Sequence, residues 1–147
     1  MRDVMQGSIR IDLGDGTNPI AMVDDEEMDY ALARRFHKRS GLSNPLVHFL
    51  DGAAFIDHLT AVRGDASLWP AAVLMDINMP RMNGFEVVEA LRRDDLFRDL
   101  PVVMMLTSSD DPRDRERASV AGADGYLLKP YDPKCYLSFF TALAAAA

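Results

Sequence analysis

The sequence contains little that would place the chain outside the cell or in a membrane. It has one cysteine, Cys135, in 147 residues, so it can form no internal disulfide and has no cysteine cluster to bind a metal. No apolar run approaches the ~20 residues that a membrane-spanning helix needs. The amino terminus lacks a basic segment followed by an apolar one, which argues against a secretory signal. We therefore expect a cytoplasmic protein without a membrane partner.

Basic residues are also scarce. Sixteen Lys and Arg residues stand against 23 Asp and Glu residues, which gives a formal net charge of −7. A negative surface repels phosphate backbones, so we expect no direct binding of nucleic acid. Hydrophobic residues make up 48% and charged residues 27% of the chain, a composition typical of globular domains. The length fits one domain with its own core.

Strand-like and helix-like patterns alternate from Pro19 onward. Short apolar runs predict five strands, at 20–23, 46–50, 71–75, 102–106 and 126–128. Helical periodicity predicts five helices, at 30–40, 53–62, 84–93, 112–121 and 133–145. Continuously apolar strands are typical of a parallel sheet that is buried on both faces by the helices of right-handed crossovers. The predicted fold class is therefore α/β, with a doubly wound five-stranded parallel sheet.

The front of the chain has a different composition. Residues 1–18 are punctuated by glycine, aspartate and asparagine, with one short alternating segment at 8–13. We expect a loose extension there, with one edge strand at most. The predicted organisation is an extension over 1–18 followed by a single domain over 19–147, with no further domain behind it.

Polar side chains stand where the predicted strands end. Asp24, Asp25, Asp76, Thr107 and Lys129 each end an apolar run or follow it directly. The carboxyl ends of parallel strands share one edge of a sheet, where the ligands of open α/β sheets bind. We therefore expect these five side chains to meet in one pocket. Each alone has a plainer interpretation as a turn, cap or solvated residue, but their joint placement favours a site.

Three carboxylates in one pocket require a proton or a cation to offset their repulsion. A carboxylate cluster without histidine suits Mg²⁺, with Mn²⁺ as an alternative, better than zinc. A cation beside Lys129 would form a phosphate pocket, and carboxylates can accept phosphoryl groups. Asp76 is the expected acceptor because it ends the middle strand. The three histidines, His37, His48 and His58, are interpreted as structural or surface residues away from this site.

The motifs resemble those of the receiver domain of bacterial two-component response regulators. Gly84 follows Asp76 by eight residues, and the other matching segments are Val23-Asp24-Asp25-Glu26, Met75-Asp76-Ile77-Asn78-Met79-Pro80, Leu106-Thr107-Ser108, Gly122-Ala123-Asp124 and Tyr126-Leu127-Leu128-Lys129-Pro130. The resemblance covers about Pro19 to Leu143. It implies the flavodoxin-like (CheY-like) three-layer sandwich with strand order 2-1-3-4-5. Within the family the chain is similar to stand-alone regulators, including those paired with phytochrome-type kinases.

The resemblance also implies residue roles. Asp76 would be the phosphoacceptor, and Thr107 and Lys129 would bind the phosphoryl oxygens. Asp24, Asp25, Asp76 and the backbone carbonyl of Asn78 would hold Mg²⁺. Thr107 and Tyr126 would form a switch pair, although a strand tyrosine is equally consistent with plain core packing. The bond between Lys129 and Pro130 would be a cis peptide.

The implied function is a phosphorylation switch rather than an enzyme with a separate substrate. The phosphodonor would be a sensor histidine kinase or a phosphotransfer protein, and a downstream protein would recognise the phosphorylated state. The broad apolar surface of the last helix suggests a homodimer through that helix. The rivals are a phosphatase with an aspartate nucleophile, which would need an acid where Asn78 stands, and a scaffold that is never phosphorylated.

Overall fold

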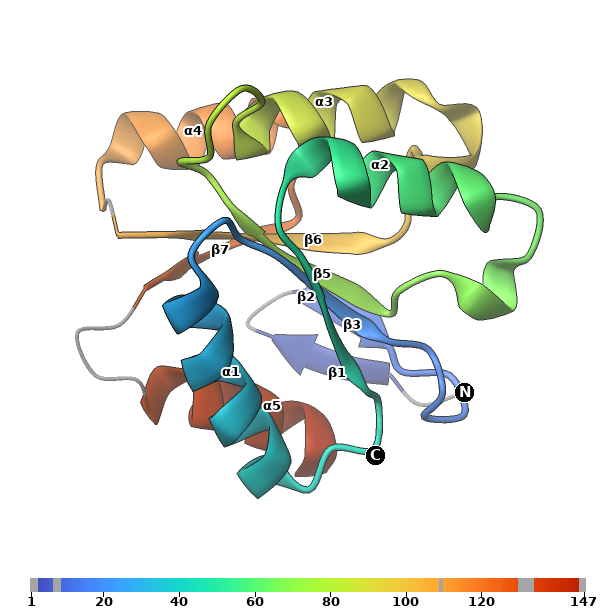
Figure 1. Cartoon of the computed structure of the whole chain (residues 1–147), viewed down its shortest axis with the longest axis vertical. Coiled ribbons are helices and arrows are strands. Elements are labelled where there is room, and N and C mark those ends of the chain that lie inside the picture. The colour runs from blue at the N-terminus through green and yellow to red at the C-terminus, as the bar shows by residue number, and fades with distance from the viewer. Residues whose placement is uncertain (1–2, 7–8, 109, 130–133, 146–147) are drawn as a thin grey trace.

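The computed structural model describes residues 3–6, 9–108, 110–129 and 134–145 (Figure 1). Its centre is a five-stranded parallel sheet in the order β4-β3-β5-β6-β7. The strands are β3 (Ile20–Val23), β4 (Leu46–Phe49), β5 (Ala72–Asp76), β6 (Val102–Thr107) and β7 (Gly125–Leu128). Apart from an additional hairpin at the front, this is the predicted 2-1-3-4-5 arrangement, and the predicted fold class is confirmed.

Helices cover both faces of the sheet (Figure 1). One face carries α1 (Glu27–Ser40) and α5 (Lys134–Ala145). The other carries α2 (Gly52–Ala61), α3 (Gly84–Arg93) and α4 (Pro112–Ala121), and two short 3₁₀ turns, η1 (Ala66–Leu68) and η2 (Asp95–Phe97), precede β5 and β6. The sheet therefore separates two apolar cores, and β3, β5 and β6 are buried along their whole length.

Local signals in the sequence fix the ends of several helices. Helix α3 begins with a capping box, in which the Asn83 side chain accepts from the backbone N–H of Glu86 and the Glu86 carboxylate accepts from the N–H of Asn83. Helix α4 begins at Pro112 behind the Asp111 cap. It ends at Gly122, whose φ of 108° is a left-handed conformation that glycine adopts without strain.

The front segment differs from the sequence prediction. Strands β1 (Asp3–Gln6) and β2 (Ile9–Asp12) form an antiparallel hairpin. Ile11 and Leu13 are fully buried in the same core as the inner faces of α1 and α5. The Asn44 side chain donates to the backbone carbonyls of Leu13 and Asn18, which ties the segment to the loop before β4. From Ile11 to Asn18, where the sequence predicted a loose extension, the chain thus contributes apolar side chains to a core and is held by hydrogen bonds.

The apolar surface of α5 is accounted for within one chain. Its large apolar residues are buried or half-buried against α1, the sheet and the hairpin residues; they are Tyr136, Leu137, Phe139, Phe140, Leu143 and Ala144. The width of this apolar surface motivated the predicted homodimer. It no longer supports one, because the chain itself covers these side chains.

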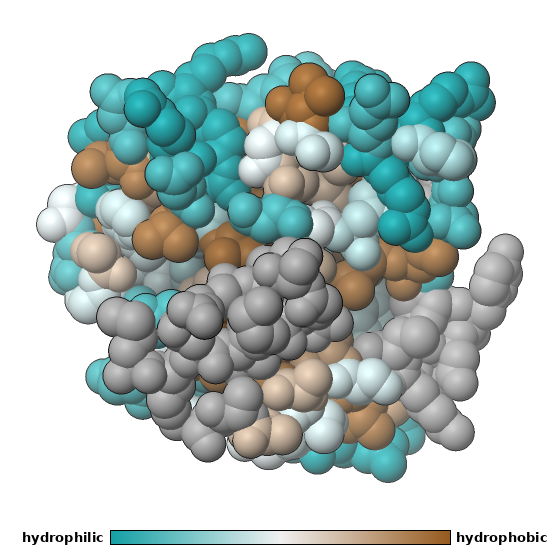
Figure 2. All heavy atoms as spheres, turned by 180° about the vertical axis from the view of Figure 1, so that it is seen from behind, coloured by the Kyte–Doolittle hydropathy of each residue, from teal (hydrophilic) through white to brown (hydrophobic). Residues whose placement is uncertain are grey.

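On the face opposite the view of Figure 1, hydrophobic residues form separate groups among hydrophilic ones (Figure 2). Among the described helices, none combines the length and the apolar character required to cross a bilayer.

Candidate functional site

Four of the five residues predicted to converge lie together at the carboxyl edge of the sheet. Asp24 and Asp25 follow β3, Asp76 ends β5, and Lys129 follows β7. The Lys129 ammonium lies 3.2 Å from Oδ2 of Asp24 and 3.2 Å from Oδ1 of Asp76. One carboxylate oxygen from each of Asp24, Asp25 and Asp76 lies within 4.8 Å of the others. Residues separated by more than a hundred positions therefore share one pocket.

Close backbone packing holds Asp76 in place. The N–H of Gly84, the first residue of α3, donates to the carbonyl of Ile77 at 2.9 Å. A Cβ atom on Gly84 would lie 2.3 Å from the backbone oxygen of Asp76, so only glycine lets α3 start this close to the strand end. This contact gives a physical reason for the glycine eight residues beyond Asp76.

Burial and mutual repulsion make the carboxylates costly to ionise. Burial is the main cause that raises the pKa of Asp76, to about 7, and the charge of Asp24 raises it further. Burial likewise raises the pKa of Asp24. For Lys129, burial alone lowers the pKa, but the hydrogen bond to Asp29 and the charges of Asp24 and Asp76 outweigh it and raise the pKa above its usual value. The pocket thus has more negative charge than its one lysine can balance.

The acidic pocket fits a divalent cation. In the described part of the chain, Oδ1 of Asp25 is buried without a hydrogen-bond partner. Oδ2 of Asp24 is also buried without one, although the Lys129 ammonium forms an ion pair with it. Buried oxygens that lack donors are costly unless a cation or water satisfies them. Hard oxygen ligands of this kind suit Mg²⁺ or Mn²⁺.

Two further predicted residues lie on the neighbouring strands. Thr107 is buried at the end of β6, one residue beyond Leu106, which pairs with Asp76 in the sheet. A side-chain hydrogen bond joins Thr107 and Tyr126, and burial raises the pKa of Tyr126. The Tyr126 ring packs against the core on the α2–α3–α4 side and lies 4.8 Å below the Arg115 guanidinium. Tyr126 is therefore a partly buried residue that packs against this core and also contacts Thr107.

Two predicted residues, Asn78 and Pro130, remain. Asn78 lies two residues beyond Asp76 in the loop after β5, and its side chain is exposed. Pro130 lies outside the described residues, so the predicted cis peptide after Lys129 is not described either.

Three residues near the site were missed in the sequence. Asp29, in the first turn of α1, accepts a hydrogen bond of 2.7 Å from the Lys129 ammonium. His48 on β4, predicted to lie away from the site, donates from Nε2 to the backbone carbonyl of Asp24 and stacks on the Tyr30 ring. Tyr136 of α5 is buried, and burial followed by the charge of Asp29 raises its pKa. No local motif marks these residues, because their roles depend on partners from other elements.

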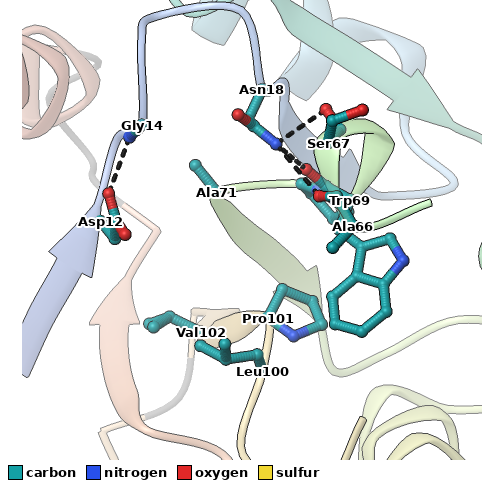
Figure 3. A pocket seen from close by; sticks show the side chains of 11 residues that line it. Asp12, Gly14, Asn18, Ala66, Ser67, Trp69, Ala71, Leu100, Pro101 and Val102 are labelled. Atoms are coloured by element: carbon teal, nitrogen blue, oxygen red, sulfur yellow. Dashed lines mark hydrogen bonds between the residues drawn. The ribbon is translucent and has the colours of Figure 1, made fainter. Parts of the chain in front are cut away.

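A cavity of about 710 Å³ lies at the opposite edge of the sheet (Figure 3). Its lining includes Ala71 and Val102, which stand at the amino ends of β5 and β6, together with Trp69 and Pro101. The Asn18 side chain there donates to the backbone carbonyls of η1 and its flank, as Figure 3 shows. The Asn18 amide is thus already bonded to the loop that lines the cavity. We therefore place the functional site at the carboxyl edge of the sheet.

Comparison with known proteins shows the family of the chain. The family model of the response regulator receiver domain matches residues 20–138. A probable methanogenesis regulatory protein, FilR2 of Methanothrix harundinacea, is 32% identical over 111 residues, which cover 76% of this chain and 71% of that protein. The phosphate regulon transcriptional regulatory protein PhoB of Escherichia coli is 38% identical over 78 residues, which cover 53% of this chain and 34% of PhoB. The match thus spans about a third of PhoB.

Solved structures show the same fold. The response regulator RPA3017, described in red light signaling of R. palustris, superposes with a TM-score of 0.73 at 34% identity, covering 85% of this chain and 90% of that one. The Mn²⁺-bound form of the response regulator Rcp1 superposes with a TM-score of 0.72 at 23% identity, covering 87% and 92%. This family consists of phosphoacceptor switches rather than conventional enzymes. The chain belongs to the receiver domain family of two-component response regulators.

Proposed function

We propose that this protein is a response regulator in which Asp76 accepts a phosphoryl group from a phosphohistidine of a sensor histidine kinase or phosphotransfer protein. One observation carries the proposal: three carboxylates from two strand ends and the Lys129 ammonium share one pocket at the carboxyl edge of the sheet. This arrangement places a nucleophile, ligands for a cation and a phosphate-binding cation together, which are the groups that phosphoryl transfer needs.

The chemistry follows from the positions of these groups. An oxygen of ionised Asp76 forms a bond to phosphorus while the bond from phosphorus to the histidine nitrogen breaks and leaves its electron pair on the imidazole. Lys129, 3.2 Å from Oδ1 of Asp76, pairs with a phosphoryl oxygen. Asp24, Asp25, Asp76 and the backbone carbonyl of Asn78 would hold Mg²⁺ or Mn²⁺, which supplies charge neutralisation for the carboxylates and phosphoryl oxygens.

The phosphorylated state would be read on the surface formed by α4, β7 and α5. A phosphoryl group carries about −1.5 to −2 charges near neutral pH. It would attract the Thr107 hydroxyl, which would loosen the present bond to Tyr126 and shift the balance between two arrangements of this surface. Val120 on α4 is 82% exposed and Leu128 at the end of β7 is 40% exposed, so apolar side chains are available there to a downstream protein. Hydrolysis of the acyl phosphate resets the switch.

A small-molecule donor tests the proposal without knowledge of the kinase. The protein is incubated with phosphoramidate and Mg²⁺, and intact mass spectrometry follows the gain of one phosphoryl group. We expect a hydroxylamine-labile modification in wild type and in Asp57→Asn, an exposed aspartate of α2 that serves as the matched control, but none in Asp76→Asn. A modification that persists in Asp76→Asn would place the acceptor elsewhere. Turnover of phosphomonoesters without a stable modification would favour the phosphatase instead.

A further inference from the structure

The shortest ion-pair contact of Lys129 is with Asp29 of α1, and not with the aspartates at the strand ends. Its ammonium lies 2.7 Å from Oδ2 of Asp29, compared with 3.2 Å from Asp24 and from Asp76. Asp29 lies in the first turn of α1, where the helix dipole favours a carboxylate. That preference does not explain the contact, because Glu27 of the same turn is exposed and is not among the ion-pair partners of Lys129 in the described part of the chain.

Asp29 also stands apart from the carboxylates that could hold a cation. The cluster with oxygens within 4.8 Å of one another comprises Asp24, Asp25 and Asp76, and Asp29 is not part of it. A divalent cation bound there would offset the charge of those three groups and weaken their hold on Lys129. Asp29 would then remain as the one carboxylate that still pairs with Lys129 when a phosphoryl group arrives.

We propose that Asp29 is a positioning residue that competes with the phosphoryl group on Asp76 for the ammonium of Lys129, and that it thereby favours the unphosphorylated state. This inference rests on the function proposed above. An ammonium can donate three hydrogen bonds, but their directions are tetrahedral, so a 2.7 Å bond to Asp29 constrains where the other two can point. A phosphoryl oxygen on Asp76 must be bound by one of these two remaining donors, so Asp29 and the phosphoryl group each draw the ammonium toward a different position, and this opposition is the proposed competition.

Beryllofluoride with Mg²⁺ serves as the probe of the phosphorylated state. Its affinity is measured by the change in fluorescence of Trp69 or, if that residue is silent, by calorimetry. We expect Asp29→Asn to bind beryllofluoride about two- to fivefold more tightly, the range for the loss of a partly exposed ion pair. Glu27→Gln removes a charge from the same helical turn without touching Lys129, so its affinity should equal that of wild type. Asp29→Glu keeps the charge and should also resemble wild type.

The measurement needs saturating Mg²⁺ for every variant, because the loss of a nearby negative charge also weakens cation binding. The effect is then compared in a Lys129→Ala background. If Asp29 acts through Lys129, Asp29→Asn no longer tightens binding there. An equal gain in both backgrounds would reduce Asp29 to through-space repulsion of the anion and would overturn the proposal.

A metal-free experiment separates this inference from the proposed function. Urea denaturation midpoints in EDTA are compared for Asp29→Asn, Lys129→Ala and the double variant, and a non-additive shift shows that the contact forms without cation or phosphate. Additive shifts would refute the contact itself. If wild type binds beryllofluoride but Asp29→Asn binds it equally or more weakly, the competition alone is refuted. If wild type binds no beryllofluoride while the non-additive shift is present, the proposed function fails and this inference fails with it.

Discussion

Replacing Asp76 by asparagine should stabilise the protein in the absence of metal, although it removes the proposed acceptor. Asp76 is 3% exposed, and burial and the nearby charge of Asp24 raise the pKa of its carboxyl group from the ordinary 3.8 to about 7. A pKa that is higher in the folded protein means that the folded state binds more protons than the unfolded chain between these two values. Stability from this group is therefore present below about pH 4 and is lost as the pH rises through about 7.

The magnitude follows from the same shift. A rise of about three units in the pKa of Asp76 means that ionising this group above pH 7 costs the folded protein about 4 kcal/mol, at 1.36 kcal/mol per unit. Asparagine never ionises, so Asp76→Asn avoids this cost, which already includes the attraction of Lys129 for the ionised carboxylate. We therefore expect a net gain of roughly 4 kcal/mol at about pH 8, and a difference from wild type that shrinks by about 2–3 kcal/mol at about pH 5.

Urea denaturation in EDTA at several pH values gives both quantities. Asp57→Asn, at an exposed position on α2, is the control and should change the free energy of unfolding by less than about 0.5 kcal/mol. Added Mg²⁺ should close the gap, because a cation in the pocket offsets the charge that asparagine removes. If Asp76→Asn is no more stable than wild type at about pH 8 in EDTA, or if the difference does not grow with pH, the electrostatic description of the pocket is wrong.

Three further substitutions test contacts that support the fold and the site. Arg92→Ala should lower the free energy of unfolding by about 3–5 kcal/mol in urea denaturation, because it leaves three backbone carbonyls and a carboxylate without their buried donor; a loss below 1 kcal/mol would contradict this. Gly84→Ala should cost about 2 kcal/mol or more and weaken Mg²⁺ binding, because its Cβ meets the backbone of Asp76. Gly64→Ala, with open space around the new Cβ, is the control and should be close to neutral by both measurements. Leu13→Ala should cost about 2–5 kcal/mol in thermal or urea unfolding, and a neutral result would mean that the front hairpin is dispensable for the core.

The parallel sheet and most of the site could be predicted because each depends on a local signal. The bounds predicted for the strand at 20–23 and for the helices at 84–93 and 112–121 match β3, α3 and α4. Apolar runs define where strands end, and parallel topology brings those ends to one edge. The sequence therefore predicted that Asp24, Asp25, Asp76, Thr107 and Lys129 would meet. The structure brings the three aspartates and Lys129 together and places Thr107 at the end of the neighbouring strand β6.

What sequence reasoning missed depends on contacts between distant elements. Asp29 looks like an ordinary first-turn carboxylate, and only the position of Lys129, a hundred residues later, gives it a partner. His48 occupies an edge strand, and its bond to the carbonyl of Asp24 follows from strand order rather than from any motif. The alternation at 8–13 allowed one edge strand, which corresponds to β2, but the pairing with β1 and the burial of Ile11 and Leu13 were not predicted, because these residues stand among glycines and aspartates, a composition that usually indicates a loop.

The placement of Ile11 and Leu13 bears on where this domain can be cut. The family match begins at residue 20, after both side chains, and a recombinant fragment chosen by that boundary would lack them. Such a fragment would expose part of the apolar layer between the sheet and α5. It would also leave the Asn44 amide without its two acceptors, the carbonyls of Leu13 and Asn18. Self-association or poor solubility measured on such a fragment would then result from the apolar surface exposed by the loss of Ile11 and Leu13, and would not describe the intact protein.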